Sequence, residues 1–181
     1  MAAPTVQNLL IAGSTARNGY LTVGDTITFT VRMSSAVVVN TSGGVPRLAL
    51  NIGGQTFYAN YTSGSSTNTL TFTYTVAAGQ SAPLGVVSVP SNAISLNGGT
   101  IKDTSGTSAI LTSGSVASNS NYIVDTTPPT IASVAITNAV GAQNNRLNAG
   151  DVVTLTVSTN ETVVVTGSPR LALNIGGSTV Y

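Results

Sequence analysis

The sequence predicts an all-β protein built from repeated β-sandwich modules, and three observations lead to this prediction. Residues 46–54 (PRLALNIGG) return letter for letter as residues 169–177, and self-similarity at a long period indicates modules strung along one chain. Only 6% of the residues are charged, and the abundant Thr, Ser, Asn, Gly and Val favour strands over disorder. Several stretches also alternate polar and apolar residues, as strands with one buried face do.

The first half of the chain divides into short strand signals separated by turns. An apolar run covers residues 6–11 and ends at a polar loop from Gly13, and residues 25–33 then alternate threonine with large apolar side chains. Residues 36–39 are expected to form a short edge segment. Residues 46–52 are predicted as a strand that ends at Gly53 and Gly54, a hairpin signal, with residues 55–61 as the return strand.

The next stretch completes the first module. Residues 68–76 show the clearest alternation, and residues 86–89 and 93–96 are predicted to form one strand interrupted by Pro90. Residues 100–103, 109–111 and 122–124 are expected to close the module. About seven strands with turn-rich loops and no helical pattern predict a β-sandwich of immunoglobulin type.

Residues 125–130 are predicted to be a stiff, extended linker, since Pro128 and Pro129 fix φ and remove two donors. We therefore expect residues 1–127 to form a complete immunoglobulin-like sandwich repeat and residues 128–181 to form the N-terminal part of a second. The repeats would be joined end to end, with the second truncated after the counterpart of Tyr58. The apolar residues of this second repeat would then lack a facing sheet. We therefore expect either that the chain is an excerpt of a longer array or that strands from another chain complete the second repeat.

Charge and composition exclude several classes of protein. The chain has 6 basic and 5 acidic residues, a net charge of +1 and no cysteine. The basic residues are scattered, so no footprint for nucleic acid or for an anionic membrane is expected. No apolar stretch is long enough for membrane insertion, and the first residues lack the apolar core of a signal peptide. Disulfides and thiolate metal sites cannot form.

Catalysis is not expected, because the chain has no histidine or cysteine to act as base or nucleophile. The acidic residues are few and well separated in sequence: Asp25, Asp103, Asp125, Asp151 and Glu161. The nearest pair, Asp151 and Glu161, flanks opposite ends of one predicted strand, which does not suit a paired-carboxylate hydrolase. We therefore predict that the chain is not an enzyme.

Four segments carry a resemblance to a known family. Residues 24–31 (GDTITFTV), 69–80 (TLTFTYTVAAGQ), 96–103 (LNGGTIKD) and 124–130 (VDTTPPT) resemble the tandem immunoglobulin-like repeats of large bacterial surface adhesins of the biofilm-associated and RTX type. The resemblance spans essentially the whole chain and implies an extracellular spacer at the bacterial cell surface. Such repeats extend a distal ligand-binding region and are often rigidified by calcium between modules.

Calcium is the cofactor to consider, because hard cations take carboxylate and carbonyl oxygens. An up-and-down strand count places Asp25 and Asp125 at the C-terminal pole of the first module and Asp103 at the opposite pole. A junction between modules could thus gather Asp25 and Asp125 with the next module's counterpart of Asp103, and Asp151 repeats Asp25 in the second module. The alternative is that these aspartates only form Asx-turns.

Two surface features allow other interpretations. The threonine rows of residues 26–30 and 69–75 could suggest ice or glycan binding, but we favour a solvated sheet face with good β propensity. Tyr58, Tyr61 and Tyr122 could form a sugar-stacking platform, whereas alternation assigns Tyr74 to the core.

The leading function is therefore a structural spacer of a bacterial adhesin, acting in adhesion or biofilm formation, with neighbouring repeats of the same chain as its partners. A host or matrix ligand would then bind through other regions of the protein. The alternatives are a glycan- or protein-binding module that uses loops at one pole, and a subunit of an extracellular filament that exchanges strands with another copy.

Overall fold

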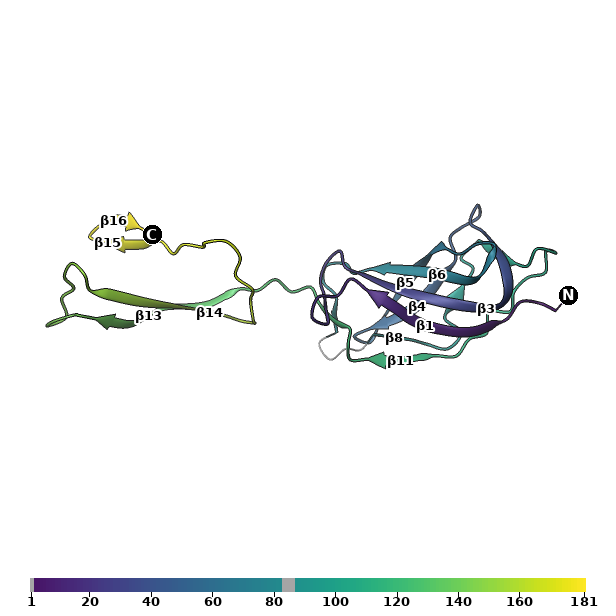
Figure 1. Cartoon of the computed structure of the whole chain (residues 1–181), viewed down its shortest axis with the longest axis horizontal. Coiled ribbons are helices and arrows are strands. Elements are labelled where there is room, and N and C mark those ends of the chain that lie inside the picture. The colour runs from purple at the N-terminus through teal and green to yellow at the C-terminus, as the bar shows by residue number, and fades with distance from the viewer. Residues whose placement is uncertain (1, 83–86) are drawn as a thin grey trace. The chain divides into compact units, whose positions relative to one another are not determined.

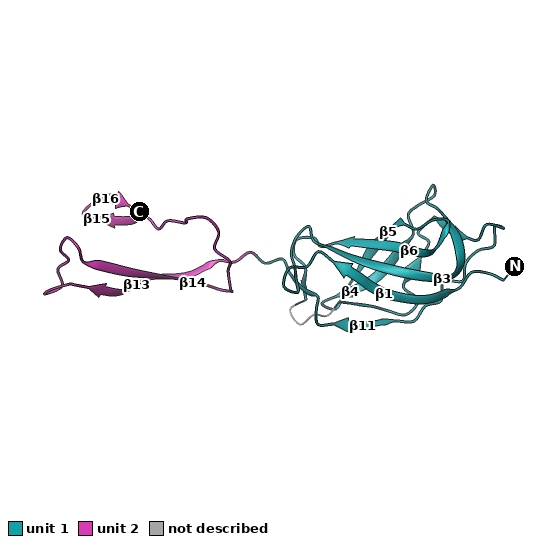
Figure 2. Ribbon diagram, in the orientation of Figure 1, with its two compact units in different colours: residues 1–127 teal, residues 128–181 magenta. Residues whose placement is uncertain are grey.

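A computed structural model describes residues 2–82 and 87–181 of the chain. The chain divides into two compact units, Met1–Thr127 and Pro128–Tyr181 (Figure 2). Strands are the only regular elements in the described residues, which confirms the all-β prediction (Figure 1). No helix in this part of the chain could cross a lipid bilayer.

Unit 1 contains short and long strands. They are β1 (Val6–Ser14), β2 (Tyr20–Leu21), β3 (Thr26–Asn40), β4 (Arg47–Ile52), β5 (Gln55–Ser63), β6 (Thr67–Thr75), β7 (Ser81–Ala82), β8 (Val87–Val89), β9 (Ile94–Ser95), β10 (Thr100–Lys102), β11 (Val116–Asn119) and β12 (Ile123–Asp125). Unit 1 has more strands than the predicted seven, and several of its strands are only two or three residues long.

Most of these strands belong to one antiparallel sheet. Its hydrogen-bonded order is β1-β3-β6-β5-β4-β8-β11, with β10 paired to β3 and β9 paired to β4. A second sheet has the order β2-β12-β7, and its β2–β12 pair is parallel. In the large sheet β6 lies between β3 and β5, so both of its edges are hydrogen-bonded.

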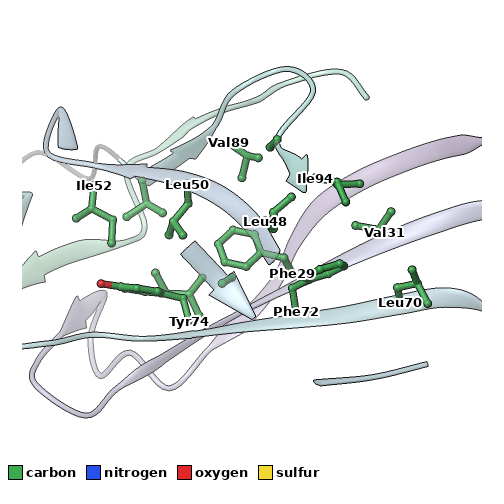
Figure 3. Packing of buried hydrophobic residues seen from close by; sticks show 14 of the residues in the cluster. Phe29, Val31, Leu48, Leu50, Ile52, Leu70, Phe72, Tyr74, Val89 and Ile94 are labelled. Atoms are coloured by element: carbon green, nitrogen blue, oxygen red, sulfur yellow. The ribbon is translucent and has the colours of Figure 1, made fainter. Parts of the chain in front are cut away.

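The core lies where the large sheet faces itself. Leu48, Leu50 and Ile52 of β4 are at most 2% exposed, and Figure 3 shows them across the interior from Phe72 and Tyr74 of β6. This confirms the prediction that every second side chain in the segment 46–52 points inward. Tyr74 is buried, as predicted, and the side-chain amide of Gln80 donates a hydrogen bond to its hydroxyl. This bond satisfies a polar atom that would otherwise be costly in the core.

The hairpin predicted at Gly53 and Gly54 is present in the structure. Gly53 and Gly54 join β4 to β5 with φ values of 59° and 89°. Two consecutive residues at positive φ define a type I′ turn, which suits the twist of paired strands.

Several expected strand boundaries were wrong. Residues 36–39 are not a separate edge segment: β3 continues to Asn40, because β10 pairs with its last residues. The expected interrupted strand around Pro90 is two strands, β8 and β9, that pair with opposite ends of β4, and Val86 lies outside the described residues. Residues 109–111 are not a strand: Ile110 makes an isolated bridge to Thr5, and the Ala109 N–H donates to the Ile101 carbonyl. The strand β11 was not expected, since its sequence VASN has weak strand propensity.

Unit 2 consists of β13 (Ile131–Val140), β14 (Val152–Thr159), β15 (Leu173–Ile175) and β16 (Ser178–Val180). The β13–β14 ladder repeats the β1–β3 ladder pair for pair: Ile11 opposite Phe29 becomes Ile136 opposite Leu155. Both register shifts recur, after Val6 and Ile11 in unit 1 and after Ile131 and Ile136 in unit 2. The two units therefore use the same local strand pairing.

Apolar side chains in unit 2 are far more exposed than their counterparts. In unit 1, Val31 is 0% exposed and Ile52 is 2% exposed. In unit 2 the corresponding Val157 is 46% exposed and Ile175 is 64% exposed. No residue of 128–181, all of which the structure describes, belongs to the buried core. The residues 163–165, which repeat the valines of β3, form no strand.

Candidate functional site

One polar cluster surrounds Asp25, in the turn between β2 and β3. The Thr15 hydroxyl donates to Asp25 Oδ1 at 2.8 Å, while the backbone N–H and the hydroxyl of Thr22 donate to Oδ2 at 2.8 and 3.0 Å. The backbone N–H of Thr26 in turn donates to the Thr15 hydroxyl at 2.8 Å. The carboxylate thereby joins the end of β1 to the turn that begins β3.

These hydrogen bonds favour the charged form of the carboxylate. The backbone N–H of Thr22 contributes most to lowering the pKa of Asp25 below its usual range, followed by the hydroxyl of Thr15. The sequence could have indicated Thr22 as a donor, because it lies three residues before Asp25 and residues at this spacing meet in a turn. Nothing in the sequence indicated Thr15, which lies ten positions away.

Asp103 occupies the second cluster, directly after β10. Its Oδ1 accepts hydrogen bonds from the Ser105 N–H at 2.9 Å, the Ser105 hydroxyl at 2.7 Å and the Thr107 N–H at 2.8 Å. The Ser105 hydroxyl contributes most to lowering the pKa of Asp103, and the Thr107 N–H comes next. Asp103 is only 5% exposed, and its buried Oδ2 has no hydrogen-bond partner among the residues that the structure describes.

The other two aspartates also accept backbone hydrogen bonds. Asp125 Oδ1 accepts from the Thr127 N–H at 3.0 Å, and Asp151 Oδ2 accepts from the Asn148 N–H at 2.6 Å. In unit 2 the position of Thr15 is held by Val140, which pairs with the first residue of β14. Since valine has no hydroxyl, the second turn lacks the donor that fixes Asp25 to β1.

The structure brings some of the predicted residues to one end of unit 1. Asp25 precedes β3, and Asp125 ends β12, which pairs in parallel with β2 through Val124 opposite Leu21. Asp103 follows β10, which pairs with the far end of β3 through Lys102 opposite Val38. Asp25 and Asp125 thus lie toward one end and Asp103 toward the other, while Asp151 belongs to unit 2.

A calcium ion bound within unit 1 would compete with protein donors. Both oxygens of Asp25 already accept hydrogen bonds, and the described residues contain no group of three or more His, Cys, Asp or Glu placed to share a metal. Calcium takes six to eight oxygens. Among the described residues, Asp103 Oδ2 and Glu161 Oε1 are buried carboxylate oxygens without a hydrogen-bond partner. Asp103 and Asp125 accept from the N–H two residues on, as in an Asx-turn, whereas Asp25 and Asp151 accept from the N–H three residues before.

A small cavity lies between β1 and the segment that precedes β11. It has a volume of about 160 Å³. It is lined by Val6, Gln7, Asn8 and Leu9 of β1 and by Thr112, Ser113, Gly114 and Ser115 before β11. Ligand pockets usually measure about 300–1,000 Å³. This cavity is therefore small for the glycan expected by the binding-module alternative.

The outer face of β4 and β5 carries Tyr58, one of the tyrosines that could stack on a sugar. The Arg47 guanidinium lies 4.0 Å from the ring centroid of Tyr58, whose side chain is 44% exposed. The cation covers part of the ring and contributes a cation–π interaction. Arg47 therefore covers one face of the ring on which a sugar would stack.

Comparisons with protein-family models, with curated proteins and with solved structures found no match to this chain.

Proposed function

We propose that this chain is a spacer segment of a bacterial cell-surface adhesin, made of immunoglobulin-like sandwich repeats joined in tandem. The observation that carries the proposal is the repetition itself. Residues 46–54 recur at 169–177, and the β13–β14 ladder has the pairs and both register shifts of the β1–β3 ladder. A chain that repeats one fold gains length, and length is what a spacer supplies.

The junction supports a mechanical role. The two units divide between Thr127 and Pro128, at two successive prolines that restrict the backbone. The last residues of unit 1 are also held in place, since the Thr126 hydroxyl donates to the carbonyl of Gln80 at 2.8 Å and the Thr127 N–H donates to Asp125. The linker thus leaves unit 1 from an anchored point, as a stiff spacer requires.

Calcium between repeats belongs to this proposal as an implication of the resemblance. In an array, Asp25 and Asp125 at one end of a repeat would face the counterpart of Asp103 in the next. The ion would then stiffen the junction by bridging carboxylates of successive repeats.

The proposal predicts a narrow distribution of distances between the two units. Because the chain has no cysteine, fluorophores can be attached at Asn68→Cys and Ser158→Cys and the distribution measured by single-molecule energy transfer. The matched control carries Pro128→Gly and Pro129→Gly, which should broaden the distribution. If the native linker already gives the broad distribution of the glycine variant, the spacer proposal fails. Saturable glycan binding by the native chain would instead favour the binding-module alternative.

A further inference from the structure

Asparagine is followed directly by glycine twice in the chain, at residues 18–19 and 97–98. In such a pair the side-chain amide lies close to the next backbone nitrogen, and glycine has no side chain to hinder that nitrogen. Asparagine is accordingly counted among the thermolabile residues of proteins. The two pairs place the same reactive dipeptide in two different surroundings.

Both pairs have the same backbone conformation. The φ values are 53° and 84° at Asn18 and Gly19, and 48° and 89° at Asn97 and Gly98, as in a type I′ turn. The residues that flank each pair are joined by a backbone hydrogen bond, of 2.9 Å in the first turn and 2.8 Å in the second. Both asparagines are also exposed, so local conformation and exposure do not distinguish them.

The surroundings of the second pair restrain it. The side-chain amide of Asn97 donates a hydrogen bond to the Val45 carbonyl at 3.1 Å. A Cβ at Gly98 would overlap the carbonyl oxygen of Gly43, so the two backbones are closely packed. A reaction at the Asn97 amide therefore requires these contacts to open first.

The first pair lacks these restraints. Within the described residues, the side chain of Asn18 has no hydrogen bond of the kind that holds Asn97. A Cβ at Gly19 would lie 3.6 Å from the nearest atom, the Asn121 carbonyl oxygen, which is an ordinary contact. The side chain of Asn18 is thus free to turn toward the backbone nitrogen of Gly19 at the tip of an exposed loop.

We propose that Asn18 is a site of spontaneous deamidation in the folded protein, and that the fold protects Asn97 from the same reaction. The co-reactant is water. Whether or not the chain is a spacer does not affect this site, because the turn belongs to unit 1 alone.

The reaction closes a ring and then opens it. The Gly19 backbone nitrogen attacks the side-chain carbonyl carbon of Asn18, and a C–N bond forms while the bond to Nδ2 breaks. Ammonia leaves with the proton of the attacking nitrogen. Water then cleaves one of the two C–N bonds of the resulting succinimide, giving aspartate or isoaspartate. In isoaspartate the main chain runs through the former side chain and is one carbon longer.

Isoaspartate at position 18 would disturb the strand that leads out of unit 1. The Gly19 carbonyl accepts a hydrogen bond from the Ile123 N–H at 2.9 Å, beside the parallel pair of Tyr20 in β2 and Ile123 in β12. An extra main-chain carbon before Gly19 displaces this carbonyl, and hydrogen bonds weaken steeply when their geometry is lost. Aspartate leaves the main chain unchanged, so only the isoaspartate product should loosen β12.

The test is incubation of the full chain at mildly alkaline pH, below its melting temperature, in water labelled with heavy oxygen. Site-resolved mass spectrometry then measures the label at each pair. We expect deamidation at Asn18 to be about fivefold faster than at Asn97, the factor that one net hydrogen bond contributes. In urea the protecting contacts are absent, and the two rates should be equal. Asn18→Gln is the matched control, which should remove the reaction at position 18 and leave Asn97 unchanged.

Equal rates at the two asparagines of the folded chain overturn the proposal. So does a folded chain in which neither asparagine reacts during the time that converts the unfolded chain. A difference of the same size in urea also contradicts the proposal, because it would assign the selectivity to flanking residues instead of the fold.

Amide exchange tests the consequence for β12. The fraction with isoaspartate at position 18 should exchange the Ile123 N–H about fivefold faster than the unmodified chain, since one net hydrogen bond is lost. The variant Asn18→Asp should exchange this N–H at the native rate. Equal exchange in all three proteins would show that the turn does not hold β12.

Discussion

The hydroxyl of Thr15 donates a hydrogen bond of 2.8 Å to the carboxylate of Asp25 and joins the end of β1 to the start of β3. The same hydroxyl accepts a bond from the Thr26 N–H. One threonine thus connects the carboxylate to the backbone of the longest strand. In unit 2 the equivalent position is Val140, so this link is confined to unit 1.

Replacing Asp25 by alanine should destabilise unit 1 by about 1 kcal/mol, because three hydrogen bonds at a partly exposed site are lost. Thr15→Val should cost less, since the two Thr22 bonds remain. Urea unfolding at neutral pH measures both, with Asp151→Ala as the matched change in unit 2. A stable Asp25→Ala variant would mean that water replaces the Thr15 and Thr22 donors at no cost.

Asp25 and Asp103 should make unit 1 less stable in acid. Hydrogen bonds lower the pKa of both carboxyls in the folded state. A carboxyl of this kind stabilises the fold above its unfolded pKa, about 3.9, and the stabilisation is lost as the pH falls through the lower folded-state pKa. Unfolding free energies measured from pH 7 down to pH 2 should show this loss. In Asp25→Asn the dependence should be shallower, and an unchanged profile would remove Asp25 from the explanation.

Phe72→Ala should destabilise unit 1 by about 3–5 kcal/mol, because a fully buried ring is replaced by a cavity. The ring also packs edge-on against Tyr61 with centroids 5.9 Å apart. The control is Thr71→Ala on the outer face of the same strand, which should cost less than about 1 kcal/mol. Chemical denaturation measures both, and similar losses would show that β6 does not face the core as described.

Gly53→Ala should cost more than Gly176→Ala, although the two glycines have the same neighbours in sequence. Their φ values are 59° and 61°, so alanine carries about 1–2 kcal/mol of backbone strain at either site. A Cβ at Gly53 would also overlap the Ser81 carbonyl oxygen, whereas one at Gly176 meets nothing within 4 Å. Amide exchange resolved by unit measures the difference, and equal costs would contradict the close approach of Ser81.

Calcium should not raise the melting temperature of unit 1, because the oxygens of Asp25 accept bonds from Thr15 and Thr22. The measurement compares melting curves with millimolar calcium and with a chelator. A rise that Asp103→Asn removes would instead identify the unpartnered Oδ2 of Asp103 as a calcium ligand.

Much of the strand pattern could be predicted because it depends on local periodicity. Residues 69–75 alternate so strictly that only one face can be buried, and Leu70, Phe72 and Tyr74 are buried. The candidate aspartates could be picked out from the sequence because charged residues are rare in this chain. Their donors were harder to find, because Thr15 reaches Asp25 only after β1 and β3 have paired.

The two copies of PRLALNIGG separate what sequence alone determines from what tertiary structure decides. In both, the paired glycines form the turn of a hairpin, with φ near 60° and 90°, because glycine is the residue that adopts these angles without strain. The strand before the turn differs: β4 spans Arg47–Ile52, whereas β15 spans only Leu173–Ile175. The strands β8 and β9 pair with the two ends of β4, and the core buries the leucines of β4. A strand extends as far as neighbouring strands pair with it and cover its apolar face.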